Sequence, residues 1–110
     1  MIPDKAVAEL AQARALLTVN ARAAGAVCGV ALERALVAVA GGGAGSLGPL
    51  GARLRVAGLL PPDLHLLVKY VAKTRARCVH ALPTPTAAQV ERMIARSYQV
   101  VAALAERGDS

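Results

Sequence analysis

The fold is decided by residues 61–85, which read PPDLHLLVKYVAKTRARCVHALPTP. A proline pair followed by an aspartate is typical of a helix start, because proline in the first turn loses no hydrogen bond and the acid complements the helix dipole. Apolar residues then recur at helical spacing as far as Val79, and Pro83 and Pro85 prevent the helix from continuing. This stretch therefore predicts a long amphipathic helix that ends at about Val79.

Similar signals predict further helices on both sides of this stretch. Pro3 and Asp4 begin a helix that runs to about Leu17, and Asn20 is a suitable N-cap for the next. No Gly or Pro separates these two, so one continuous helix is also possible. The glycine-rich segment 41–45 is a connector, and it is followed by a short helix that is capped by Ser46 and closed by Gly58. The last helix begins with the capping-box pattern Thr86-x-x-Gln89 and ends near Gly108.

Length and pattern together predict one all-α domain over residues 1–110, built as a bundle of four or five helices joined by short loops. No alternating strand pattern occurs anywhere in the chain. Residues 23–40 are apolar almost all round, so this helix should be the central one. Because Glu33 and Arg34 interrupt it, we interpret it as a buried core helix and expect no membrane association.

The two cysteines and two histidines give no indication of a metal site. Cys28 and Cys78 lie within apolar helical patterns, which favours free, buried thiols, and with His65 and His80 they show no zinc-ligand spacing. We therefore predict neither a metal nor a cofactor. Without a basic-then-apolar leader pattern or a disulfide framework, we expect a cytoplasmic protein.

Positive charge is concentrated in the middle of the chain, which carries a formal net charge of +6. Residues 41–80 hold six bases against the single acid Asp63, whereas the segments before and after them are nearly balanced. Such an excess is a candidate surface for RNA or another anion. Tyr70 and Tyr98 are the only aromatic residues, which excludes an aromatic sheet that stacks bases. Solubility alone would also explain the arginines.

Arg75 is the unusual residue of the 61–79 helix. Lys69, Lys73 and Arg77 fall on its polar side, one turn apart, but Arg75 projects from the middle of the apolar stripe. A guanidinium there requires a carboxylate, backbone carbonyls, a second subunit or a phosphate. Acids are scarce, and Glu33 is the natural partner within the fold.

His80 follows five residues later, just before the prolines. In an unbroken helix the two side chains would point about 140° apart, so they can meet only if the helix ends or bulges between them. An adjacent His and Arg can act on a phosphodiester, because imidazole transfers protons near neutral pH and guanidinium neutralises the phosphate.

The segment Arg75-Ala76-Arg77-Cys78-Val79-His80 resembles the signature of the HEPN superfamily. The helix layout over residues 20–105 is similar to that of prokaryotic HEPN domains. It includes Ala31-Leu32-Glu33-Arg34-Ala35-Leu36, the glycine linker, and the short helix that ends in Ala57-Gly58-Leu59-Leu60-Pro61-Pro62.

The resemblance implies a four-to-five-helix up-and-down bundle that forms a homodimer, in which two copies of the Arg-to-His segment face one another across a cleft. Many members are metal-independent endoribonucleases, often toxins paired with a nucleotidyltransferase or another antitoxin, and others only bind RNA. Arg75 and His80 would be the catalytic pair, and Arg77, Lys73 and Lys69 would extend the phosphate surface. The residue after the arginine is usually polar, most often Asn, whereas here it is Ala76, a difference that bears on cleavage and leaves binding open.

Two alternatives remain at this point. The chain could be a catalytically silent helical module that dimerises or holds another protein, with Arg75 closed in an ion pair with Glu33 and His80 pointing away. A helix-turn-helix DNA binder is the weaker alternative, because the 61–79 helix lacks the Asn/Gln/Ser-rich face that reads base edges.

Overall fold

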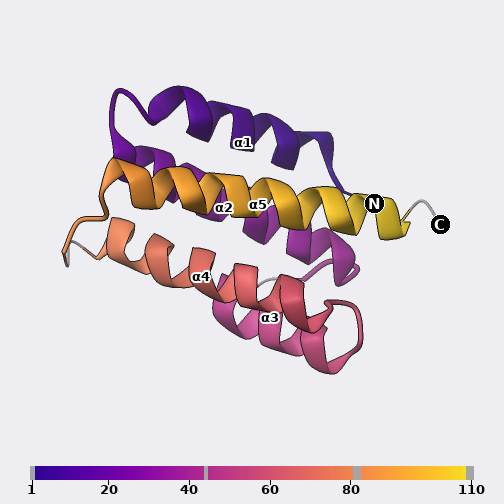
Figure 1. Ribbon diagram of the computed structural model, residues 1–110. Coiled ribbons are helices and arrows are strands. Elements are labelled where there is room, and N and C mark those ends of the chain that lie inside the picture. Colours follow the sequence, from indigo (N-terminus) through magenta and orange to yellow (C-terminus); the bar gives the residue numbers. More distant parts are fainter. Residues whose placement is uncertain (1, 44, 81–82, 109–110) are drawn as a thin grey trace.

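The computed structural model describes residues 2–43, 45–80 and 83–108, and within these it contains five helices and no strand (Figure 1). The all-α helical bundle is therefore confirmed. The helices are α1 (Asp4–Leu16), α2 (Ala21–Val39), α3 (Leu47–Val56), α4 (Pro62–Val79) and α5 (Ala87–Gly108).

The predicted central position of the second helix is confirmed, because α2 contacts each of the other four helices. Its buried residues are mostly small, which allows the neighbouring helices to approach closely and reach native packing density without large aromatic residues. These residues are Ala24, Gly25, Cys28, Gly29, Ala31, Leu32, Ala35 and Leu36. Cys28 and Cys78 are free, buried thiols, as expected.

The directions of the helices alternate everywhere except between α2 and α3. Helices α2 and α4 are antiparallel, because Gly25 faces Cys78 whereas Gly29, further along α2, faces the earlier residue Arg75 of α4. Gly51 of α3 faces Val68 of α4, and this pair of helices is also antiparallel. It follows that α2 and α3 run in the same direction, and the expectation of strict up-and-down topology needs this one correction.

The helix boundaries follow the local signals in the sequence. The first two helices are separate, because Asn20 is extended and its side chain accepts a hydrogen bond of 3.0 Å from the N–H of Ala23. Thr86 and Gln89 form the expected reciprocal capping box, with hydrogen bonds of 2.9 and 3.1 Å. Gly58 closes α3 with a φ of +77°.

Ser46 differs from expectation in its side chain. It occupies the N-cap position of α3, but its side chain makes no capping hydrogen bond. The first N–H groups of α3 are therefore not satisfied by this side chain. This end of α3 lies beside the C-terminal half of α4, which is where the candidate site is found.

Candidate functional site

The side chain of Arg75 points from α4 towards α2 and lies across Gly29. A Cβ at position 29 would come within 2.6 Å of Cγ and 2.8 Å of Nε of Arg75. Only a glycine leaves enough room for this side chain to run along the surface of α2. The guanidinium is thereby directed towards Glu33, one helical turn further along α2.

Arg75 and Glu33 form an ion pair at the edge of the bundle. Nη1 of Arg75 lies 3.3 Å from Oε2 of Glu33, and the two side chains are 27% and 31% exposed. Nε of Arg75 is buried and has no hydrogen-bond partner. A buried, unsatisfied N–H group costs about 1–3 kcal/mol, so the guanidinium is held in place by Glu33 but is not fully satisfied by it.

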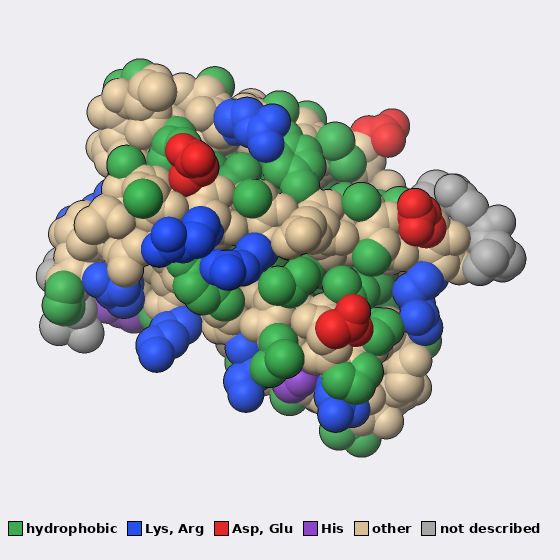
Figure 2. Space-filling model, viewed as in Figure 1, with side chains coloured by type: hydrophobic (Ala, Val, Ile, Leu, Met, Phe, Trp, Pro, Cys, Tyr) green, Lys and Arg blue, Asp and Glu red, His purple; other side chains and the backbone are tan. Residues whose placement is uncertain are grey.

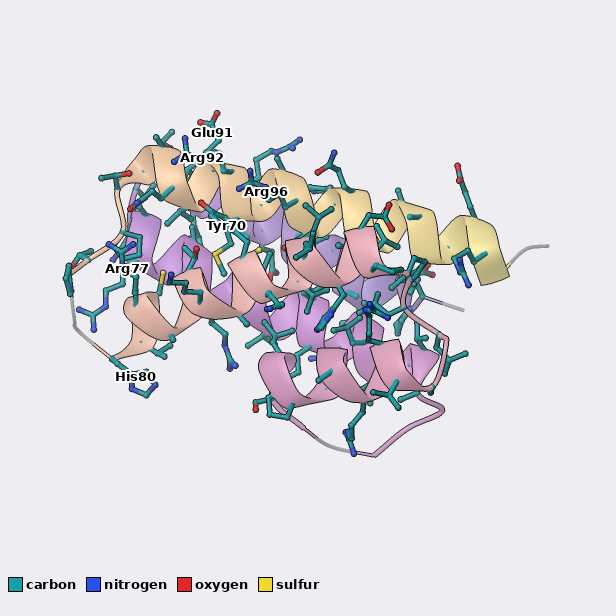
Figure 3. The ribbon with its side chains drawn as sticks, turned by 60° about the horizontal axis from the view of Figure 1, so that its bottom comes forward. Tyr70, Arg77, His80, Glu91, Arg92 and Arg96 are labelled. Carbon is teal, nitrogen blue, oxygen red and sulfur yellow. The ribbon has the colours of Figure 1, made fainter. Side chains whose placement is uncertain are left out.

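His80 lies at the end of α4, where its backbone N–H donates to the carbonyl of Ala76 and its side chain is exposed. In Figure 3 the imidazole extends beyond the last turn of α4, on the side away from Arg92 and Arg96. His80 is the C-cap of α4, with φ −100° and ψ 10°, so the backbone leaves helical geometry only after its hydrogen bond to Ala76.

Arg75 and His80 line the same surface groove, which has a volume of about 300 Å³. The start of α3 forms the opposite wall, and Ala72, Ala76 and Val79 of α4 complete the lining. Backbone N–H groups at the start of a helix carry a partial positive charge and are a common binding site for phosphate. The groove therefore combines a helix N-terminus, a guanidinium and an imidazole.

Lys69, Lys73 and Arg77 do not line this groove. The two lysines are exposed on the outer side of α4, and Nε of Arg77 donates a hydrogen bond of 3.0 Å to the carbonyl of Pro83. Figure 2 shows Lys and Arg side chains gathered over α4 and the first half of α5. The five predicted site residues therefore divide between two sides of α4.

The structure brings a further group of residues to this outer side, and sequence reasoning did not identify it. Arg96 of α5 lies over the ring of Tyr70, with Cζ 4.2 Å from the ring centroid. Arg92, one turn earlier, lies beside the phenol oxygen of Tyr70, whose hydroxyl lies 3.4 Å from the carbonyl of Gln89. The i, i+4 spacing of the two arginines is visible in the sequence, but its pairing with α4 is not.

The two arginines change the acidity of Tyr70. Burial alone would raise the pKa of the phenol, but hydrogen bonds from Arg92 and Thr74 and the charges of Arg92 and Arg96 outweigh burial, and the pKa is lowered. The lowered pKa indicates an electropositive environment at the α4–α5 face.

Among the described residues no group of three His, Cys, Asp or Glu side chains is placed to hold a metal ion. In the same part of the chain, no helix is both long enough and apolar enough to cross a membrane. No family model, curated protein or solved structure matches this chain. The functional argument therefore rests on the geometry of α4 and its neighbours.

Proposed function

We propose that this chain is a HEPN-like RNA-binding protein, and that the groove of Arg75 and His80 takes a backbone phosphate. The observation that supports this most directly is that both side chains line one groove together with the start of α3. A phosphate there would meet backbone N–H groups, a guanidinium and an imidazole. These are the donors that recur in phosphate sites of proteins.

Glu33 does not remove the capacity of Arg75 to bind a phosphate. The ion pair uses one nitrogen of the guanidinium and one oxygen of the carboxylate. Arginine has five N–H donors in a fixed planar arrangement, so others remain for a ligand. By holding the guanidinium at the groove, Glu33 also lowers the entropy lost on binding.

The cations on the outer side of α4 support binding at longer range. Lys69, Lys73 and Arg77 add positive potential close to the groove, and the whole chain carries +6. Such a field raises the local concentration of a polyanion and accelerates its association. RNA binding by this surface should weaken as salt is added.

A second candidate function is metal-independent RNA cleavage by a homodimer. Cleavage at a ribose 2′-hydroxyl needs a group that accepts a proton and one that donates a proton, and each groove holds one His80. Two chains with facing grooves would supply two imidazoles and two copies of Arg75. In that role the protein would be toxin-like, with an antitoxin or nucleotidyltransferase as its partner protein. Ala76 cannot contribute the polar group usual at its position.

The first experiment is binding of mixed-sequence single-stranded RNA, followed by fluorescence anisotropy. The most informative variant is Ala76→Glu, since Ala76 is exposed, lines the groove and takes no part in the ion pair. Its new carboxylate should weaken RNA binding about tenfold or more through repulsion of the phosphate. Ala8→Glu, at an exposed position of α1, makes the same change of charge and should bind like the native chain.

Incubation of the same RNA without metal separates the candidate functions. Cutting that is abolished by His80→Ala and by Arg75→Gln, at matched folding, would establish the nuclease. RNA binding without cutting would support the binding function alone. Absence of binding by the native chain would overturn both and favour the silent protein-interaction module, for which the Arg75–Glu33 ion pair is the specific observation.

A further inference from the structure

Two arginines of α5 are held at the surface by a tyrosine instead of by acids. Arg96 stacks on the ring of Tyr70 and Arg92 lies beside its phenol oxygen. Among the described residues, the two ion pairs are Arg34–Glu9 and Arg75–Glu33, and neither involves these arginines. Glu91 is the nearest acid in sequence, and in Figure 3 it extends away from Tyr70.

This arrangement brings like charges together without a carboxylate between them. Residues four apart on a helix have Cβ atoms about 5–6 Å apart, so the two guanidinium groups lie close enough to contact one ligand. Lys73 and Arg77 continue the positive charge along the outer side of α4. Mutual repulsion of these cations costs energy in the free protein, and an anion bound among them would relieve it.

We propose that Tyr70, Arg92 and Arg96 form a second phosphate-binding site, on the α4–α5 face, which takes a backbone phosphate of the RNA strand. This inference rests on the proposed function. A stacked guanidinium keeps its N–H edges free for two parallel hydrogen bonds to phosphate oxygens. The neighbouring Lys73 and Arg77 would bind the adjacent phosphates, and this suits a polymer better than a single phosphorylated small molecule.

Tyr70 acts here as a positioning residue. Its ring supports Arg96 and its phenol oxygen lies beside Arg92, so less side-chain freedom is lost when the phosphate binds. Because Arg96 covers one face of the ring, and Arg14 covers Tyr98 with Cζ 4.7 Å from its centroid, the arginines occupy the rings on which a base would stack. We therefore expect the site to recognise phosphate and to be indifferent to base sequence.

The test measures the affinity of single-stranded RNA over a range of salt concentrations. Each phosphate contact contributes about 0.7 to the slope of log affinity against log salt, so Arg92→Gln/Arg96→Gln, which removes the one phosphate held at this site, should reduce the slope by about 0.7. Affinity should fall about tenfold or more, since two charge-assisted hydrogen-bonding groups are removed. The control is Lys5→Gln/Arg55→Gln, which removes two exposed cations from α1 and α3 and should retain the native slope.

Two substitutions of Tyr70 test positioning. Tyr70→Phe keeps the ring under Arg96 and loses the phenol oxygen beside Arg92, whereas Tyr70→Leu loses both the ring and the oxygen. We expect affinity to fall in that order while the salt slope stays close to native, because all the cations remain. Circular dichroism checks that each variant is folded.

Four outcomes test the inference and separate it from the function on which it rests. Native binding with an unchanged slope in Arg92→Gln/Arg96→Gln would overturn the second site and leave the groove intact. Equal loss in the control would also overturn it, because net charge alone would then explain binding. Absence of RNA binding by the native chain would overturn the proposed function and this inference together. An abasic oligonucleotide that binds far more weakly than RNA would contradict phosphate recognition.

Discussion

Gly29 has no side chain, and the aliphatic part of Arg75 occupies the space that a Cβ would need. Gly29→Ala has two opposing effects on the free energy of unfolding. Alanine is better than glycine in a helix by about 1 kcal/mol, but overpacking against Arg75 costs about 1–3 kcal/mol and displaces the guanidinium from Glu33. We expect a net destabilisation of about 1 kcal/mol, measured by urea unfolding.

The same substitution in an Arg75→Ala background provides the control. With the obstructing side chain removed, Gly29→Ala should stabilise α2 by about 1 kcal/mol through helix propensity alone. A change of sign between the two backgrounds would show that Gly29 serves to accommodate Arg75. The same sign in both would contradict the close packing of these two residues.

Cys28 provides a pH-dependent contribution to stability. Burial, opposed by the hydrogen bond with Ser97 and reinforced by Cys78, raises the pKa of its thiol from 9.0 to about 11. Between pH 9 and about pH 11 the thiol of the unfolded chain loses its proton, whereas the thiol of the folded chain keeps it. The free energy of unfolding therefore has its full value below the pKa of the unfolded chain and falls as the pH rises towards the pKa of the folded chain. Two pKa units correspond to about 3 kcal/mol.

We therefore expect the free energy of unfolding of the native chain to fall by about 3 kcal/mol more than that of Cys28→Ala between about pH 8 and about pH 11. Urea unfolding at both pH values measures this difference. Other groups titrate in the same range, but they are common to both chains and cancel in the comparison. Parallel curves would show that Cys28 is exposed to solvent.

At the scale of an element, the start of α5 positions Arg92. The capping box of Thr86 and Gln89 satisfies two backbone N–H groups, and Gln89 also accepts from Tyr70. Thr86→Ala should lower the free energy of unfolding by about 1 kcal/mol, as expected for loss of an N-cap. Thr84→Ala, at an exposed position just outside the helix, should leave thermal stability unchanged. Equal effects would argue against the capping box.

The positions of the helices could be predicted from the sequence because the signals that mark helix boundaries are local. Prolines, an Asn cap, a capping box and Gly58 each act within a few residues, and each can be identified without knowing what packs against the helix. Glu33 could be named as the partner of Arg75 because few acids were available. By contrast, the side chain of Ser46 does not cap α3, since a suitable residue type does not guarantee a hydrogen bond.

Features that depend on packing between helices could not be predicted in this way. Helices α2 and α3 are parallel because of the path taken by the connector between them, and the hydrophobic periodicity of the sequence contains no information about that path. Arg92 and Arg96 belong to a segment whose charges balance, and their position beside Tyr70 depends on the packing of α5 against α4. The groove likewise needs the start of α3 next to the end of α4.

At the scale of the whole molecule, the two proposed phosphate-binding surfaces lie on two sides of α4. One is the groove with Arg75 and His80, and the other is the face with Tyr70, Arg92 and Arg96. If two chains associate through their grooves, each brings a formal charge of +6 to the contact. Repulsion between them would oppose association, and it is screened over about 10 Å at moderate ionic strength.

The proposed homodimer therefore predicts an unusual dependence on salt. Added salt should strengthen self-association, because it screens the repulsion between chains while apolar contacts such as Val79, 47% exposed at the groove, are unaffected. A short RNA should act in the same direction by bridging the two grooves. Sedimentation equilibrium at low and moderate salt would measure the dissociation constant.

Val79→Glu should prevent association, whereas Val56→Glu, on α3 and outside the groove lining, should not. A monomer under all conditions would rule out the shared cleft, and with it cleavage by paired His80 residues, while leaving RNA binding by the single chain to be judged on its own measurement.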